Sequence, residues 1–319
     1  MITDIWCLGV YLAGNMWNDS DTMPWCSGLL YYNELKTEKK AWREVMEFAA
    51  KNGCNAIWIN PSNGVKYNSH PEIAINGAWT IEELKEEINY IKSLGMRAFP
   101  KLNFSAGHDT WLGEYSKMVS TPKYYEVCRD LIHEMCDVFE TPEFMGLELD
   151  EENGLNQGRL QYACYRQYEL RWHDVNYLCD CVREKGVRPN MDADYYWSFP
   201  EEFLENVPRD VSLNIWMYGN LYFDEAHPRP TDPWSSKRLD SFKDLTEAGY
   251  DIFMYGASNE NTHNFEHHIR YANEFLNPDK ISGMYITGSW DPINEATKDY
   301  YFDAVYQAKY AKEIYFGGK

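Results

Sequence analysis

Short apolar runs of strand length recur along the chain, and a segment with helical spacing of apolar residues follows each of them. This alternation is typical of βαβ units and a parallel sheet. The predicted strands are Asp4–Leu12, Asn55–Asn60, Arg97–Phe104, Phe144–Asp150, Arg188–Asp192, Ser212–Tyr218, Asp251–Tyr255 and Ser282–Thr287. Eight such units close a (β/α)8 TIM barrel, and 319 residues lie within the length range of that α/β fold.

The helices between these strands begin and end at recognisable residues. Thr80 and Glu83 have the spacing of a capping box, and Gly95 stands where the helical pattern stops. The predicted helices are Thr80–Leu94, Pro122–Phe139, Tyr162–Lys185, Ser235–Ala248, His263–Phe275 and Asn294–Ile314.

The chain reads as one unit. No linker-like or low-complexity segment divides it, which predicts a single catalytic domain over residues 1–319. A doubly wound sheet is the competing architecture. A glycine-rich phosphate turn usually follows the first strand of such a sheet, and the segment VYLAGNMW is not such a turn.

Composition narrows the expected partners. The formal net charge is −20, whereas a nucleic acid or an anionic membrane would require clustered Lys and Arg. The 12 Trp and 25 Tyr are a high content of rings that stack on flat, hydroxylated ligands. We therefore expect a carbohydrate partner and neither nucleic acid nor membrane; the oligomeric state stays open.

The cysteines and the N-terminal residues indicate the cellular compartment of the protein. The cysteines are scattered and lack the spacing of a disulfide framework or a metal knuckle, so we expect reduced thiols at Cys7, Cys26, Cys54, Cys128, Cys136, Cys164, Cys179 and Cys181. Met1 is followed by no basic segment and no apolar helix long enough to span a bilayer. These features predict a cytoplasmic protein, or a secreted one if a leader has been removed.

The most informative segment is FMGLELDEEN, residues 144–153, a strand pattern that ends in carboxylates. Alternation would place Glu148 and Asp150 on one face of the strand and the apolar residues 145, 147 and 149 on the other. Burying two carboxylates costs several kcal/mol unless something pairs with them. Their position at the end of a buried strand therefore predicts acid/base chemistry.

The active site of a barrel forms at the carboxyl ends of its strands. The polar and aromatic residues at or after those ends are Tyr11, Asn15, Trp17, Asn60, Asn63, Lys101, Asn103, His108, Glu148, Asp150, Glu151, Glu152, Asp192, Asp194, Tyr195, Tyr196, Trp197, Trp216, Tyr218, Tyr255, Trp290 and Asp291. Any one of these rings is more often a packing residue than a ligand contact. Together, aromatic walls around carboxylates are typical of a sugar site.

Three segments resemble glycoside hydrolase family 20, the β-N-acetylhexosaminidases. TIEELKEEINYIKSLGMRAFPKLNFSAGHDTW, residues 80–111, is similar to the second helix, third strand and Pro-Gly-His loop of that family. FMGLELDEEN lies where the family carries its Asp-Glu pair, and ISGMYITGSWD resembles its last strand, which ends in a Trp that stacks on substrate. FMGLELDEEN is also similar to family 18, in which alternating acids follow a Gly.

The resemblance implies an exo-acting, retaining β-N-acetylhexosaminidase without a cofactor or a metal. Asp150 and Glu151 would be the catalytic pair: Glu151 the general acid/base, and Asp150 the residue that orients the 2-acetamido group of a terminal amino sugar. That group, not the enzyme, would attack the anomeric carbon. The residues implied to bind substrate or support the pair are Glu148, Glu152, His108, Asn60, Asp194, Trp216, Tyr218, Tyr255, Trp290 and Asp291.

Two departures from the family keep alternatives open. Family 20 usually has an Arg after its first strand, where this chain has Asn15 and Trp17, and its Gly-Gly-Asp-Glu motif reads Glu-Leu-Asp-Glu here. One alternative is a glycosidase of other specificity that uses Glu148 or Glu152 with a partner such as Asp194. Another is a catalytically silent carbohydrate-binding barrel. Strand alternation favours Glu152 as the acid and the adjacent pair favours Glu151, which we choose.

Other motifs point to no chemistry. His263 and His267 have the spacing of zinc ligands on a helix, but no Glu is placed as in a zincin, so a solvated helix face is the better interpretation. Cys179 and Cys181 are two residues apart and do not share a helix face. The nucleophile pattern G-x-S-x-G of serine hydrolases does not occur.

Overall fold

The computed structural model describes residues 3–18, 31–158, 160–221, 223, 229–259 and 261–316. Its main sheet has eight parallel strands in the spatial order β5-β2-β1-β10-β9-β8-β7-β6. In chain order these are β1 Ile5–Tyr11, β2 Ala56–Asn60, β5 Arg97–Pro100, β6 Phe144–Gly146, β7 Arg188–Asp192, β8 Ser212–Trp216, β9 Ile252–Ala257 and β10 Ile281–Thr287. Each predicted strand overlaps one of them. A small parallel pair, β3 Val65–Lys66 and β4 Trp79–Thr80, lies apart from the main sheet.

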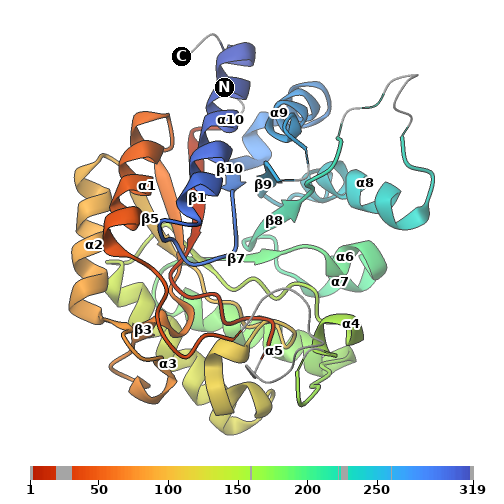
Figure 1. The fold of residues 1–319 in the computed structure, drawn as a ribbon. Coiled ribbons are helices and arrows are strands. Elements are labelled where there is room, and N and C mark those ends of the chain that lie inside the picture. The colour runs from red at the N-terminus through yellow and green to blue at the C-terminus, as the bar shows by residue number, and fades with distance from the viewer. Residues whose placement is uncertain are drawn as a thin grey trace.

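The two outermost strands in this order, β5 and β6, meet and nearly close the sheet. Lys101 and Gly146 form an isolated parallel bridge. Just beyond β5, Leu102 N donates to Gly146 O at 2.9 Å, and Phe104 N donates to Leu147 O at 3.2 Å. Helices surround the strands on the outside (Figure 1). The predicted (β/α)8 barrel is therefore confirmed.

The helices cover the barrel between successive strands. They are α1 Lys39–Lys51, α2 Ile81–Ser93, α3 Pro122–Val138, α4 Gly154–Gln157, α5 Tyr168–Arg183, α6 Tyr195–Ser198, α7 Pro200–Asn206, α8 Pro233–Glu247, α9 Asn264–Phe275 and α10 Lys298–Phe316. The predicted capping box of α2 is confirmed, because the Thr80 side chain accepts from Glu83 N and the Glu83 carboxylate accepts from Thr80 N.

The predicted helix Tyr162–Lys185 was wrong at its start. It begins six residues later, at Tyr168 (168 − 162 = 6). The residues before Tyr168 do not continue the helix because Arg166 turns its buried side chain inward, where it bonds to Phe104 O and the Glu152 carboxylate.

The core has two layers, which follow from the period-two alternation along the strands. Inside the barrel, rings and small residues from alternate strand positions pack together: Ile5, Cys7, Ala56, Trp58, Phe99, Phe144, Phe253, Tyr255 and Tyr285. The other strand positions face the helices and form a larger apolar cluster that includes Trp6, Leu8 and Val10. The packed side chains of the inner layer fill much of the barrel interior.

Strand β6 is shorter than predicted. It ends at Gly146, whereas the predicted strand continues to Asp150. The faces follow the prediction as far as residue 150: Met145, Leu147 and Leu149 join the outer cluster, and Glu148 and Asp150 face the barrel mouth. The backbone then turns, because φ is +55° at Glu148, +67° at Leu149 and +50° at Glu151. Non-glycine residues seldom adopt such angles, and their concentration here marks the segment as specially held.

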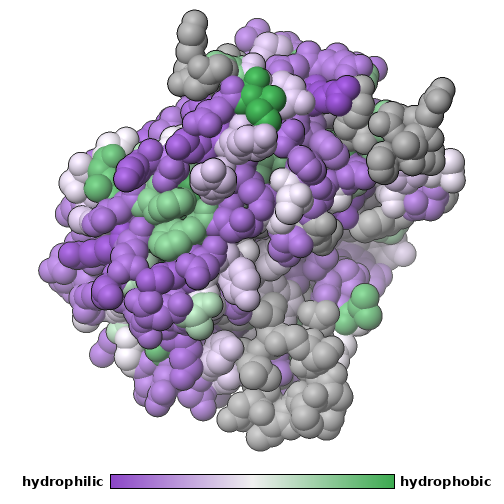
Figure 2. Space-filling model, turned by 45° about the horizontal axis from the view of Figure 1, so that its top comes forward, coloured by the Kyte–Doolittle hydropathy of each residue, from purple (hydrophilic) through white to green (hydrophobic). Residues whose placement is uncertain are grey.

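Hydrophilic residues cover most of the face drawn in Figure 2, with hydrophobic residues in small patches. Among the described residues, no helix is both long enough and apolar enough to cross a bilayer. The described cysteines are free thiols, as expected, and Cys26 lies outside the described residues.

Candidate active site

A cavity of about 270 Å³ opens at the carboxyl ends of the strands. Its walls are Tyr11, Met16, Trp17, Asn103, His108, Glu148, Asp150, Glu151, Asp192, Trp216, Tyr218, Tyr255 and Trp290. They come from segments far apart in the sequence that the barrel brings together. The cavity has the size for one sugar unit and the mixed ring-and-carboxylate lining that a sugar needs.

A buried ion pair lies beside the floor of the cavity. Lys101 Nζ pairs with Glu148 Oε1, and both side chains are buried. Lys101 Nζ also donates to Tyr285 Oη at 2.9 Å, while Asn60 Nδ2 donates to Glu148 Oε2 at 3.3 Å. Burial lowers the pKa of Lys101, but Glu148 together with Tyr285, Tyr255 and Asp192 more than offsets it, so that pKa lies well above its usual value. Glu148 is therefore already paired without a ligand.

His108 links the two residues proposed as the catalytic pair. His108 Nδ1 lies 3.2 Å from Asp150 Oδ1, and His108 Nε2 lies 3.5 Å from Glu151 Oε2. Burial disfavours the charged imidazole, but Asp150 and Glu151 outweigh it and raise the pKa of His108 to about 10. Burial raises the pKa of Asp150, yet His108 and the amide of Asn103, which donates at 3.1 Å, lower it below its usual value.

The same three residues are the only described group of three or more His, Cys, Asp and Glu whose ligand atoms lie close enough for a metal ion, all within 4.8 Å. A metal would need a neutral imidazole lone pair, whereas both ring nitrogens of His108 face carboxylate oxygens, at 3.2 Å from Asp150 Oδ1 and 3.5 Å from Glu151 Oε2. The donor set therefore fits a hydrogen-bonded relay better than a metal site.

Aromatic rings form the opposite wall. Trp216 and Tyr218 are stacked with ring centroids 5.5 Å apart, and Tyr218 meets the rings of Tyr255 at 5.7 Å and Trp290 at 5.8 Å. The guanidinium of Arg238 lies 3.8 Å from the centroid of Trp216 and holds its ring from outside. These four rings thus pack on one another along one side of the cavity.

Asp192, at the end of β7, is a buried carboxylate of the cavity without a matching cation of its own. Its Oδ1 has no hydrogen-bond partner among the described residues. Burial and the nearby charges of Asp150 and Glu148 raise its pKa well above the usual value. Such a group is suited to bind a polar ligand.

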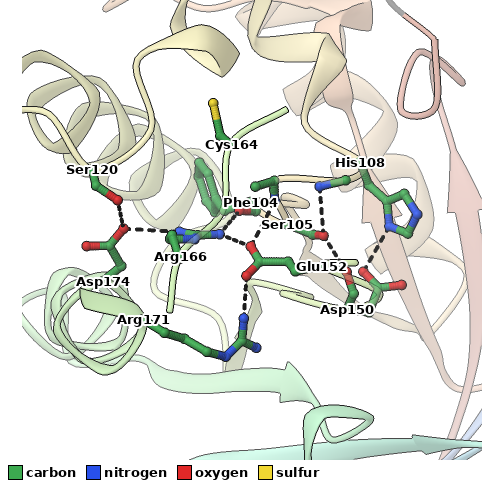
Figure 3. A network of polar contacts seen from close by, with 12 residues as sticks. Phe104, Ser105, His108, Ser120, Asp150, Glu152, Cys164, Arg166, Arg171 and Asp174 are labelled. Atoms are coloured by element: carbon green, nitrogen blue, oxygen red, sulfur yellow. Dashed lines mark hydrogen bonds and ion pairs between the residues drawn. The ribbon is translucent and has the colours of Figure 1, made fainter. Parts of the chain in front are cut away.

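Glu152 points away from the cavity. Figure 3 shows its carboxylate directed toward Arg166 and Arg171, on the side opposite His108 and Asp150. Strand alternation had favoured Glu152 as a residue that faces this cavity, and that expectation was wrong. The left-handed φ at Glu151 turns the backbone, so the Glu152 side chain points to the opposite side. Burial raises the pKa of Glu152, but the two guanidinium groups lower it below its usual value.

The remaining predicted site residues lie around this centre. Asn60 is buried beneath the cavity against Glu148. Asp194 accepts from Glu151 N at 2.9 Å and lines an adjoining cavity. Asp291 is not among the cavity walls, and its carboxylate accepts instead from Ser289 Oγ at 3.1 Å.

Five cavity residues were outside the predicted site: Tyr11, Met16, Trp17, Asn103 and Asp192. Tyr11, Trp17, Asn103 and Asp192 stood among the residues at or after the ends of the predicted strands, so the barrel rule alone could have found them. Met16 carried no signal. Neither did Arg166 and Arg171, because nothing in the local pattern pairs residues so much later in the chain with Glu152.

No family model matches the sequence, and no curated protein matches it significantly. Solved structures with the same architecture do. A GH20 exo-β-N-acetylglucosaminidase from Vibrio harveyi, in complex with N-acetylglucosamine, aligns with a TM-score of 0.63 and 11% identity over 98% of this chain and 57% of that one. A β-N-acetylhexosaminidase from Bacteroides fragilis aligns with a TM-score of 0.63 and 13% identity over 95% and 65%.

One of the tandem GH20 catalytic modules of the pneumococcal exo-β-D-N-acetylglucosaminidase StrH aligns with a TM-score of 0.63 and 15% identity over 99% of this chain and 84% of that one. What these structures share with this chain is the fold. The resemblance to family 20 is thus confirmed for the barrel. This chain spans a little over half the length of the Vibrio harveyi protein.

Proposed function

We propose that this protein is a retaining exo-glycosidase that releases a terminal β-linked N-acetylhexosamine, with the substrate's acetamido group as the nucleophile. The observation that carries the proposal is the adjacent pair Asp150 and Glu151, which flanks His108 inside a cavity with aromatic walls. The similarity of the fold to GH20 enzymes supports it.

In the first step Glu151 gives a proton to the glycosidic oxygen while the acetamido oxygen attacks the anomeric carbon, and the bond between that carbon and the leaving oxygen breaks. Asp150 accepts a hydrogen bond from the acetamido N–H and stabilises the positive charge of the cyclic intermediate. Glu151 then takes a proton from water, whose oxygen bonds to the anomeric carbon while the bond between that carbon and the acetamido oxygen breaks, which restores the acetamido group.

The surroundings of Asp150 and the nearby rings suit the binding of an acetamido sugar. Asp150 must be ionised to orient the amide, and its pKa is lowered despite burial because His108 lies beside it. Trp290 would support the sugar face, and the hydroxyl of Tyr218 or Tyr255 would donate to the acetamido oxygen. All three rings line the cavity that contains Asp150.

The test compares an aryl β-N-acetylglucosaminide with the matching aryl β-glucoside. Removing the acetamido group removes the nucleophile, so turnover of the glucoside should be undetectable or far slower and not merely weaker in KM. Comparable turnover of the two would overturn the proposal. It would point to an enzymic nucleophile, for which Glu148 in the same cavity is the candidate.

A further inference from the structure

One sector of the barrel interior is polar. Among the described residues, the buried apolar side chains of the inner layer come from the other six strands of the main sheet, and none comes from β7 or β8. The buried hydrophobic side chains of these two strands join the outer cluster instead. The positions between them hold Asn190, Asp192, Ser212 and Asn214, all of them buried. Because burying polar side chains costs free energy, this sector is poorly explained by packing alone.

Asp192 brings the polar sector to the wall of the cavity. It is 3% exposed, and its Oδ1 has no hydrogen-bond partner within the described part of the chain. Lys101 lies near enough to act on Asp192, but its Nζ is paired with Glu148. Trp216 Nε1, in the same cavity wall, is likewise buried without a partner among the described residues. A hydroxyl group is the small ligand group that can bond to both a carboxyl oxygen and an indole N–H.

The part of the substrate that Asp192 faces follows from its closeness to Asp150. Strands β6 and β7 are neighbours in the sheet, and Asp192 N donates to Glu148 O at 2.8 Å. After burial, the charge of Asp150 is the main cause that raises the pKa of Asp192. In the function proposed above, Asp150 accepts a hydrogen bond from the 2-acetamido N–H. The group nearest to Asp192 is therefore the acyl part of that same substituent.

We propose that Asp192 is a specificity-determining residue, which selects substrates whose 2-acylamido group carries a hydroxyl on the carbon beyond its carbonyl. The N-glycolyl group is the simplest of this class. Its hydroxyl pairs with Asp192 Oδ1 and accepts from Trp216 Nε1, whereas the methyl group of an N-acetyl substituent leaves both atoms without a partner. The proposal rests on the function proposed above and narrows its substrate class to hexosaminides with a polar acyl group.

The test uses the 4-nitrophenyl β-glycosides of N-glycolylglucosamine and N-acetylglucosamine, which have the same leaving group. Asp192→Leu should lower the ratio of kcat/KM for the N-glycolyl substrate to kcat/KM for the N-acetyl substrate by about tenfold, through loss of a hydrogen bond. The ratio is independent of the folded fraction of the preparation. The lower nucleophilicity of the N-glycolyl amide is a property of the substrate, so it cancels when the variant is compared with wild type.

Two further variants serve as controls. Asp192→Asn keeps the shape and a side-chain acceptor, so it should keep most of the wild-type ratio. Asp251→Asn should leave the ratio unchanged, because Asp251 precedes β9 at the opposite end of the barrel and pairs there with Arg188 and Lys280.

The outcomes separate this proposal from the proposed function. If the N-acetyl substrate is hydrolysed and Asp192→Leu leaves the ratio unchanged, or lowers kcat/KM for both substrates by the same factor, the selective role of Asp192 is overturned and the proposed function stands. If the wild-type protein hydrolyses neither substrate, the proposed function fails and the selective role fails with it.

Discussion

Two clusters of buried and partly buried carboxylates lie on either side of the segment 148–152, and their charges are balanced differently. In the first, Glu152 is matched by the guanidinium groups of Arg166 and Arg171, and Arg166 also reaches Asp174. In the second, which faces the cavity, Glu148, Asp150, Glu151 and Asp192 share Lys101 and His108. Neighbours in the sequence thus enter opposite environments.

The difference separates an architectural cluster from a chemical one. Paired charges with their hydrogen bonds satisfied keep pKa values low and hold a segment in place. Where carboxylates outnumber the cations around them, some carboxyl groups have raised pKa values or free oxygen atoms that can bind a ligand. An acid/base site requires such groups. The Arg166–Glu152 pair holds the end of β6, and we infer that this pairing maintains the left-handed backbone at Glu151.

The strongest test of this comparison makes the same substitution, Glu to Gln, in each of two adjacent residues, Glu151 and Glu152. Glu151→Gln should lower kcat for an unactivated glycoside by about 10²- to 10⁴-fold, because the proton donor is lost. The loss should shrink for a substrate with a good leaving group, which needs less protonation. Steady-state kinetics with a disaccharide and an activated aryl glycoside measure both.

Glu152→Gln is the companion variant. Because Glu152 holds the segment of Glu151 but gives no proton itself, any loss of activity per folded molecule should be the same for both substrates. A large, leaving-group-dependent loss in Glu152→Gln, with Glu151→Gln nearly silent, would reverse the assignment of the acid.

The second prediction concerns stability. Removing one partner of a buried pair strands the other charge, so Glu152→Gln should lower the free energy of unfolding by about 3–5 kcal/mol in urea denaturation. Asp210→Asn removes the half-exposed partner of Arg183 and should cost less than about 1 kcal/mol. Equal losses in the two variants would contradict the architectural role of Glu152.

The strands and most helices could be predicted from the sequence, whereas the environment of Glu152 could not. Strands such as β2 and β8, and the capped start of α2, depend on local pattern, and local pattern predicted them. The environment of Glu152 depends on Arg166 and Arg171, which lie in a later segment that local pattern had extended into a helix. We infer that these tertiary contacts also maintain the left-handed angle at Glu151, after which alternation no longer predicts the direction of the side chains.

The third prediction tests Asp150 within the unbalanced cluster. Asp150→Asn keeps the shape but removes the charge that would stabilise the cyclic cation, so kcat should fall by about 10²-fold. A thiazoline analogue of the intermediate should remain a measurable but weaker ligand by calorimetry. Unchanged affinity for the analogue, together with unchanged kcat, would show that Asp150 does not contact the acetamido group.

The fourth prediction concerns how the two clusters respond to pH. The pKa of Asp192 is raised in the folded protein because of burial, Asp150 and Glu148. An Asp in the unfolded chain titrates at about pH 4. Between that pH and the raised pKa, Asp192 is protonated in the folded state and ionised in the unfolded state. Folding stability therefore falls with rising pH, by up to about 1.4 kcal/mol per pH unit. Asp192→Asn removes this fall.

The unfolding free energy of Asp192→Asn, measured in urea from pH 5 to pH 8, should thus rise relative to wild type as the pH rises. Glu152 has the opposite sign, because its lowered pKa makes a contribution that is present at neutral pH and lost only as the pH falls through that pKa. A constant offset between Asp192→Asn and wild type would mean that Asp192 is ionised throughout. The cavity would then hold a full negative charge that only a cationic ligand group could neutralise.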